Sequence, residues 1–227
     1  ASMGLDLLMR DTDMARGAAT MLGYRLPVNF NRPYLATSIA NFWQRWHITM
    51  SSFFRNYLYE PLSKTQWVPM YANLVIVFIA IGIWHGAGWN FVVYGLIHGS
   101  MVAGGHFLDE RRIRNGDAII YRGLKLVSRI AWIFLIVVLT RILFRSEDLS
   151  AVGEFVQGLL GPIDGHFPIT LAGAAALFAA AALHFSPIRW RERVMAYVGT
   201  QPAWIMGIAF VVVLYTVAAM SRGRGGF

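Results

Sequence analysis

Five long apolar segments constrain this chain more than any other feature. They are Val68–Trp84, Trp89–Gly105, Ala131–Phe144, Ile169–Phe185 and Pro202–Met220, and each holds 14–19 residues. A helix needs about 17–25 mainly apolar residues to cross the hydrocarbon core of a bilayer. One such segment would fit the buried core helix of a soluble protein. Five of them in 227 residues predict about four to five transmembrane helices.

The composition supports the same fold class. Hydrophobic residues make up 56% of the chain and charged residues only 14%, which is more apolar surface than one compact soluble core of this length buries. We therefore expect an all-α, multi-span transmembrane helical protein. The chain has no cysteine, so disulfides and thiolate-bound metals are excluded.

The net charge of +8 raises nucleic-acid binding as an alternative. The basic residues lie instead in the connections between apolar segments. Lys and Arg outnumber Asp and Glu by seven to four in 1–67, six to three in 106–129 and three to one in 186–202, while 145–168 has one basic and four acidic residues. Basic connections mark the cytoplasmic side. We expect no nucleic-acid partner, a cytoplasmic or interfacial segment over 1–67, and the transmembrane segments within 68–220.

Residues 41–60 predict an amphipathic helix. Aromatic and apolar side chains recur at spacings of three and four on one face, while polar side chains including His47 occupy another; the first set is Trp43, Trp46, Met50, Phe53 and Tyr57. Trp and Tyr are favoured at the headgroup level of a bilayer. We expect this helix to lie in the membrane interface and to end at Pro61.

His85 is the most informative histidine, because it ends a continuous apolar run and is followed by Gly86, Ala87 and Gly88. An ionisable side chain at membrane depth usually faces a bundle interior or a wet cavity, and the glycines permit close approach of a ligand. An imidazole is suited to accept a proton from a hydroxyl at neutral pH. The alternative is a core histidine hydrogen-bonded to a backbone carbonyl.

His47 and His98 are candidates to share a site with His85. Three histidines raise the hypothesis of a metal centre, but no carboxylate or cysteine lies within helical reach of His85. We therefore expect no metal. Intramembrane histidines would also suit a transporter, but no inverted repeat is visible in the chain.

Three sequence motifs carry a family resemblance. They are Asn29-Phe-Asn-Arg-Pro-Tyr34, Phe42-Trp-Gln-Arg-Trp-His47-Ile-Thr-Met-Ser51 with Arg55-Asn-Tyr-Leu-Tyr-Glu-Pro-Leu62, and Trp84-His85-Gly86-Ala87-Gly88-Trp89; Thr140-Arg-Ile-Leu-Phe-Arg145 follows later. With these motifs the chain resembles the membrane-bound O-acyltransferase family, and most closely its bacterial alginate O-acetyltransferase branch.

The resemblance implies a set of roles. His85 takes the position of the family's catalytic histidine, a general base for an acceptor hydroxyl, and His47 takes the position of its paired polar residue. We assign substrate binding to Trp46, Arg55, Trp84, Trp89 and His98. The implied reaction transfers an acetyl group from a cytoplasmic thioester, with acetyl-CoA as donor and no bound cofactor, toward hydroxyls of an exported polysaccharide.

The resemblance also bears on partners and on completeness. It covers nearly all of 1–227, read as a single domain, but only the C-terminal half of a typical member. We expect a multi-pass protein of the bacterial inner membrane whose partners are the lipid bilayer, a periplasmic acetyltransferase and the missing N-terminal half. The alternative function is a non-catalytic membrane module that binds an acyltransferase.

Overall fold

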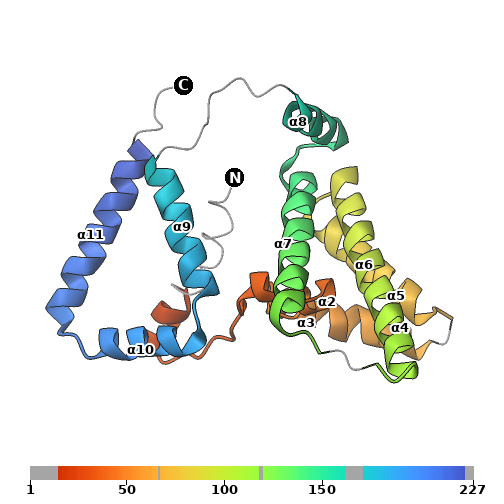
Figure 1. The fold of residues 1–227 in the computed structure, drawn as a ribbon, viewed down its shortest axis with the longest axis horizontal. Helices are drawn as coiled ribbons and strands as arrows, with labels where there is room; N and C mark the ends of the chain where they lie inside the picture. The colour runs from red at the N-terminus through yellow and green to blue at the C-terminus, as the bar shows by residue number, and fades with distance from the viewer. Residues whose placement is uncertain (1–14, 66, 118–119, 162–170, 223–227) are drawn as a thin grey trace. The chain divides into compact units, whose positions relative to one another are not determined.

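The computed structural model describes residues 15–65, 67–117, 120–161 and 171–222, and every regular element within these ranges is helical. The predicted all-α class is therefore confirmed. The chain forms two compact units, Ala1–His166 and Phe167–Phe227 (Figure 1). A single functional domain over 1–227 stays a prediction.

Three apolar helices build the first unit: α5 (Met70–His85), α6 (Trp89–Arg114) and α7 (Gly123–Arg145). Of the described helices, α6 and α7 are long and apolar enough to cross a membrane, by length and composition alone. Helix α5 has 16 residues and is shorter than a typical span. The predicted total of four to five spans is thus supported for two helices and otherwise stays a prediction.

Helices α5 and α6 pack with their backbones in close contact. A Cβ atom at Gly95 would collide with the carbonyl oxygen of Phe78, and one at Gly82 would collide with the carbonyl oxygen of Phe91. Gly95 and Gly99 have the small-xxx-small spacing that lets membrane helices approach closely. This packing holds the end of α5, which carries His85, against the start of α6.

The predicted amphipathic helix over 41–60 is broken in the structure. Helix α2 (Ile39–Trp43) is followed by a turn at residues 44–47, after which α3 (Ile48–Phe54) begins. The break occurs because His47 adopts the left-handed backbone region, with φ 47° and ψ 53°. Trp43, Trp46 and Met50 of the predicted apolar face are buried in the protein core, whereas Phe53 and Tyr57 are exposed. The location of this segment in the membrane interface stays a prediction.

The prediction that Pro61 ends this helix is wrong. After α3 the chain continues through a π-helical turn, η2 (Arg55–Tyr59), into α4 (Glu60–Lys64), where Pro61 lies in the first turn. The backbone N–H of Glu60 donates to the carbonyl of Arg55, five residues earlier. This wider turn accommodates the ring and the missing donor of proline, which a regular α-helical ladder does not.

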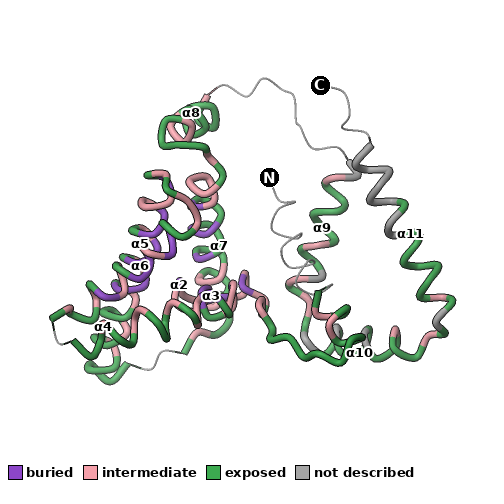
Figure 2. The backbone as a smooth tube through the Cα atoms, turned by 180° about the vertical axis from the view of Figure 1, so that it is seen from behind, coloured by how far each residue is buried: buried purple, intermediate pink, exposed green. Residues whose placement is uncertain are grey.

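The core of the first unit lies where α2 and α3 meet α5, α6 and α7. Its largest members are aromatic and β-branched side chains, including Phe42, Trp43, Phe78, Tyr94 and Val137. The buried residues form a band along the facing sides of these helices, while their outer sides are exposed (Figure 2). Outer faces that remain apolar are expected of helices that contact lipid.

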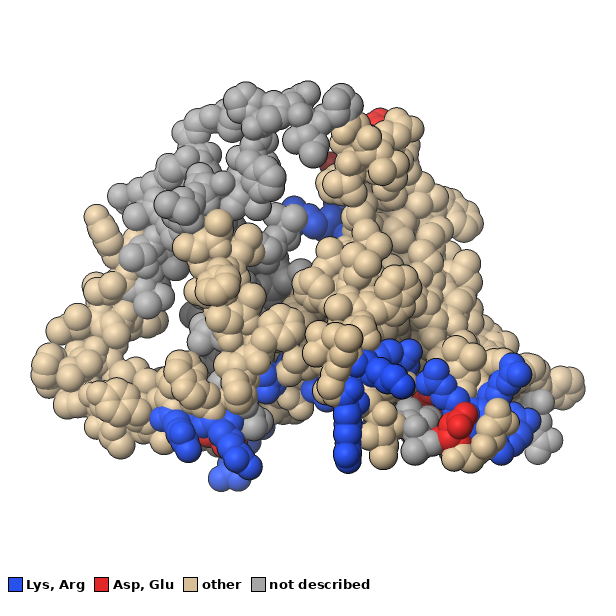
Figure 3. Space-filling model, in the orientation of Figure 1, with Lys and Arg blue, Asp and Glu red and all other residues tan. Residues whose placement is uncertain are grey.

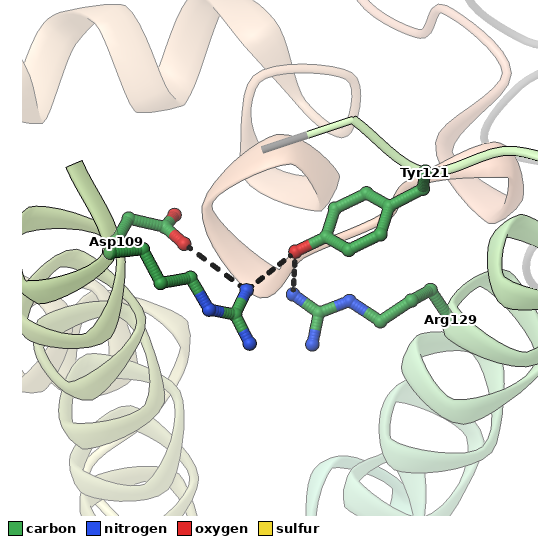
Figure 4. Close-up of polar contacts among 4 residues, drawn as sticks. Asp109, Tyr121 and Arg129 are labelled. Atoms are coloured by element: carbon green, nitrogen blue, oxygen red, sulfur yellow. Dashed lines mark hydrogen bonds and ion pairs between the residues drawn. The ribbon is translucent and has the colours of Figure 1, made fainter. Parts of the chain in front are cut away.

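Basic residues gather where α6 ends and α7 begins, as Figure 3 shows on one face of the first unit. There Arg112 and Arg129 both donate to the hydroxyl of Tyr121, over 2.9 and 2.7 Å, and Arg112 also pairs with Asp109 at 3.9 Å (Figure 4). One phenol therefore ties the end of α6 to the start of α7.

Helix α8 (Leu149–Leu160) lies within the stretch that the sequence indicates as a connection, 145–168. It begins because the carboxylate of Asp148 accepts a hydrogen bond from the backbone N–H of Ala151, at 2.8 Å, and so caps the first turn.

The second unit contains α9 (Leu171–Phe185), α10 (Ile188–Gly199) and α11 (Ala203–Arg222). Helices α9 and α11 occupy the last two predicted apolar segments. Helix α10 occupies the basic connection over 186–202 and has one apolar and one basic face, a pattern typical of helices that lie in a membrane interface.

Candidate active site

His47 and His85 lie against the same indole. The ring centroid of Trp84 is 6.2 Å from that of His47 and 4.7 Å from that of His85, and both contacts are edge-to-face. These two histidines are 38 positions apart in sequence, and both are half-buried. The structure therefore brings together the two histidines that the sequence assigns to catalysis.

The backbone at His47 is held by the preceding loop. Asn29 accepts the backbone N–H of Ile48 with its carbonyl, at 2.9 Å, and the backbone N–H of Thr49 with its side chain, at 3.1 Å. A positive φ at a residue other than glycine costs on the order of 1–2 kcal/mol and persists only where its surroundings enforce it. The strained turn thus fixes where the His47 ring points.

The imidazole of His47 has free hydrogen-bonding capacity. Its Nδ1 atom is buried and has no hydrogen-bond partner among the described residues. Burial lowers the pKa of His47 below its usual value, because desolvation disfavours the charged ring. At neutral pH the ring is therefore neutral and can hydrogen-bond a polar ligand.

His85 is the last residue of α5, is half-buried and directly precedes the turn at 86–88. Its ring contacts that of Phe144 on α7 edge-to-face, with 4.8 Å between centroids. Asn90, which is fully buried, donates to the carbonyls of Leu143 at 3.1 Å and Ser146 at 2.9 Å. These bonds hold the end of α7, and with it Phe144, beside His85.

His98 occupies a different environment. It is fully buried; Trp43 Nε1 donates to its Nδ1 at 3.2 Å, and its Nε2 lies 3.0 Å from Thr140 Oγ1. Because Nδ1 accepts, a neutral ring carries its proton on Nε2 and donates to Thr140, whose hydroxyl then donates to the carbonyl of Ile136 or Val137. Both nitrogens are occupied, which favours a structural role; substrate binding by His98 stays a prediction.

Trp46 lies in the core of the first unit and is only 5% exposed. Its ring stacks on that of Phe42, with centroids 5.8 Å apart, and the guanidinium of Arg141 lies 4.4 Å from its ring centroid. Trp46 thus contacts a cation of the protein, and its assignment to substrate binding stays a prediction.

Two of the predicted substrate-binding residues lie outside this cluster. Arg55 is exposed in the π-helical turn and donates to Asn56 at 3.3 Å. Trp89, at the start of α6, is 74% exposed. Their assignment to substrate binding stays a prediction.

Sequence reasoning missed four residues that shape the site: Asn90, Thr140, Arg141 and Phe144. The first three are polar or charged side chains within apolar segments, and that placement was the available signal, because such groups in a membrane helix normally have an internal function. Among the described residues, no three His, Asp or Glu side chains lie together as a metal site requires.

The cluster combines two half-buried imidazole rings that contact the same indole, and one of them can act as a base. A half-buried neutral imidazole can accept a proton from a hydroxyl, provided the hydroxyl reaches hydrogen-bond distance. The second ring, that of His47, contacts the same indole as His85 and can hydrogen-bond the group that is attacked. This arrangement fits transfer of a group to a hydroxyl.

Known proteins match the same part of the chain. The sequence model of MBOAT, the membrane-bound O-acyltransferase family, matches residues 8–143. Peptidoglycan O-acetyltransferase of Helicobacter pylori is 35% identical over 155 residues, which are 66% of this chain and 28% of the relative. Probable alginate O-acetylase AlgI of Azotobacter vinelandii is 37% identical over 143 residues, 61% of this chain and 27% of the relative.

A more distant relative is teichoic acid D-alanyltransferase of Bacillus subtilis, 30% identical over 108 residues, 44% of this chain and 27% of the relative. The aligned part of the chain spans between a quarter and a third of the length of each of these relatives. The family match covers more than half of the chain and includes both His47 and His85. The chain belongs to the membrane-bound O-acyltransferase family.

Proposed function

We propose that this chain carries the reacting site of an O-acyltransferase that moves an acetyl group from a cytoplasmic thioester, acetyl-CoA, toward hydroxyls of an exported polysaccharide. The observation that carries the proposal is that the rings of His47 and His85 both contact the indole of Trp84. Relatives named for acetyl transfer to alginate and peptidoglycan support the acyl group and the acceptor class.

In this proposal His85 is the general base. It takes the proton of the acceptor hydroxyl while the hydroxyl oxygen attacks the thioester carbonyl carbon. A positioned base of this kind contributes roughly 10²–10⁴-fold to the rate. His47, neutral and held by its strained turn, orients the acyl group by a hydrogen bond from its ring.

The proposal extends to location and partners. The protein resides in the bacterial inner membrane, with the basic ends of its helices on the cytoplasmic side. Its partners are the bilayer, a periplasmic acetyltransferase that receives the acetyl group, and the remainder of a full-length family member. The last partner is proposed because the relatives are more than three times as long as the part they share with this chain.

The same length difference favours a second candidate, a non-catalytic membrane module that binds an acyltransferase. Acetyl-CoA binding to the purified 227-residue chain in detergent separates the two. Saturable binding that free CoA competes away supports the enzyme. Absence of binding, together with capture of a separate family member, supports the module.

The experiment for the proposed function is acetyl transfer in membranes that carry the protein as its gene encodes it. We expect His85→Ala to lower the rate roughly 10²–10⁴-fold at unchanged protein abundance, because the base is lost. His106→Ala is the matched control, since His106 is exposed on α6 away from the cluster, and it should keep the parent rate. Full activity of His85→Ala would contradict the assignment.

A further inference from the structure

Arg141 is a cation in the apolar part of α7, enclosed by aromatic rings. Its guanidinium carbon lies 4.4 Å from the ring centroid of Trp46 and 5.7 Å from that of Phe144. The Phe144 ring in turn contacts His85 at 4.8 Å. Arg141 and the proposed base therefore lie against one phenyl ring.

The positive charge of Arg141 is not neutralised within the described chain. Its Nε and Nη2 atoms are buried and have no hydrogen-bond partner among the described residues. Contacts with aromatic faces compensate a buried cation only in part, typically by about 0.5–2 kcal/mol. Arg141 is half-buried. A cation whose donors are buried without a counter-ion is costly, and one retained inside a membrane helix indicates a function.

The guanidinium lies one phenyl ring away from the proposed base. No permanent anion of the described chain satisfies its buried donors. They can therefore bind a negative charge that forms beside the general base only during the reaction.

We propose that Arg141 is a catalytic residue that binds the oxyanion formed at the thioester carbonyl, an inference that rests on the proposed function. The acceptor hydroxyl oxygen bonds to the carbonyl carbon, its proton passes to His85, and the carbonyl π pair moves onto oxygen beside the guanidinium. When that pair returns, the carbon–sulfur bond breaks and the sulfur takes the proton from His85. The products are an ester and a free thiol.

The test is a kinetic comparison of Arg141→Gln, Arg141→Lys and Arg145→Gln in membranes that carry the protein as its gene encodes it. Arg145 is the matched control, since it is exposed one turn further along α7. We expect Arg141→Gln to lower kcat about 10²–10³-fold, with the KM for acetyl-CoA changed less than threefold. Arg141→Lys should lose less, because it keeps the charge, and Arg145→Gln should match the parent.

A higher KM for acetyl-CoA or for the polysaccharide, at unchanged kcat, would overturn the proposal, because the guanidinium would then bind a ground-state anion. An unchanged rate for Arg141→Gln would overturn it as well. Arg141→Ala separates misfolding from a lost catalytic group. Restoration of its kcat by added guanidinium ion supports direct action on the oxyanion. A kcat that guanidinium does not restore, in a variant of normal abundance and melting temperature, contradicts it.

The outcome is separable from that of the proposed function. If His85→Ala is inactive while Arg141→Gln keeps the parent kcat, the acyltransferase assignment stands and the oxyanion role fails. If His85→Ala is fully active, the proposed function itself fails, whatever Arg141→Gln does.

Discussion

Two histidine environments lie within one helical unit and differ in how their polar atoms are used. The His98 cluster, formed by Trp43, His98 and Thr140, is fully buried and joins three helices through bonds to both ring nitrogens. In the His47–Trp84–His85 cluster the two histidines are half-buried and Trp84 is 58% exposed, and the contacts of both histidines with Trp84 are edge-to-face.

The difference separates a structural histidine from a chemical one. Hydrogen bonds that are complete within the protein stabilise the fold, since a buried polar group without a partner is costly. The Nδ1 atom of His47 has no hydrogen-bond partner among the described residues and can therefore bond to a substrate. From sequence alone the two clusters look similar, because His85 and His98 both stand in apolar segments followed by glycine.

The largest effect on stability is expected for His98→Ala. The variant removes two buried hydrogen bonds, leaves the Trp43 N–H without its acceptor and opens a cavity, which together should cost about 3 kcal/mol or more. Thermal unfolding of the protein purified in detergent measures this. An unchanged melting temperature with lost acetyl transfer would instead place His98 in substrate binding.

Gly95→Ala should be next, with a cost of about 1–3 kcal/mol, because the added Cβ collides with the backbone carbonyl of Phe78 and separates α5 from α6. Both clusters would loosen, since α5 carries His85 and α6 carries His98. Unfolding midpoints are compared with those of Gly104→Ala on the same helix, where a Cβ meets nothing within 4 Å. Equal midpoints for the two variants would refute the close packing.

Thr140→Val should have a smaller effect, about 1–2 kcal/mol, since it keeps the side-chain shape and removes only the oxygen that pairs with His98 Nε2. Thr140→Ser keeps the hydroxyl and should restore most of the stability. The same unfolding assay measures both variants. A Ser variant no better than Val would show that the hydrogen bond contributes little.

The sequence predicts the helical class well, because apolar segments of this length leave few alternatives in a bilayer. Helix α8 was missed because its stretch has acidic residues and glycines typical of connections, although Asp148 is a helix-capping residue. The break at His47 was not predictable from the periodicity of 41–60. Asn29, which holds the backbone after His47, lies outside that segment. Arg141 was overlooked because an isolated arginine near a helix end resembles an interfacial anchor.

The central claim is that His47 and His85 form one reacting site, and a double-variant rate measurement tests it most directly. Acetyl-transfer rates per folded molecule are compared for His85→Ala, for His47→Gly, which permits the positive φ, and for the double variant. Residues that act as a unit give non-additive losses. We predict that the double variant is no slower than His85→Ala alone. Losses that multiply, or a His85→Ala variant at the parent rate, would contradict the claim.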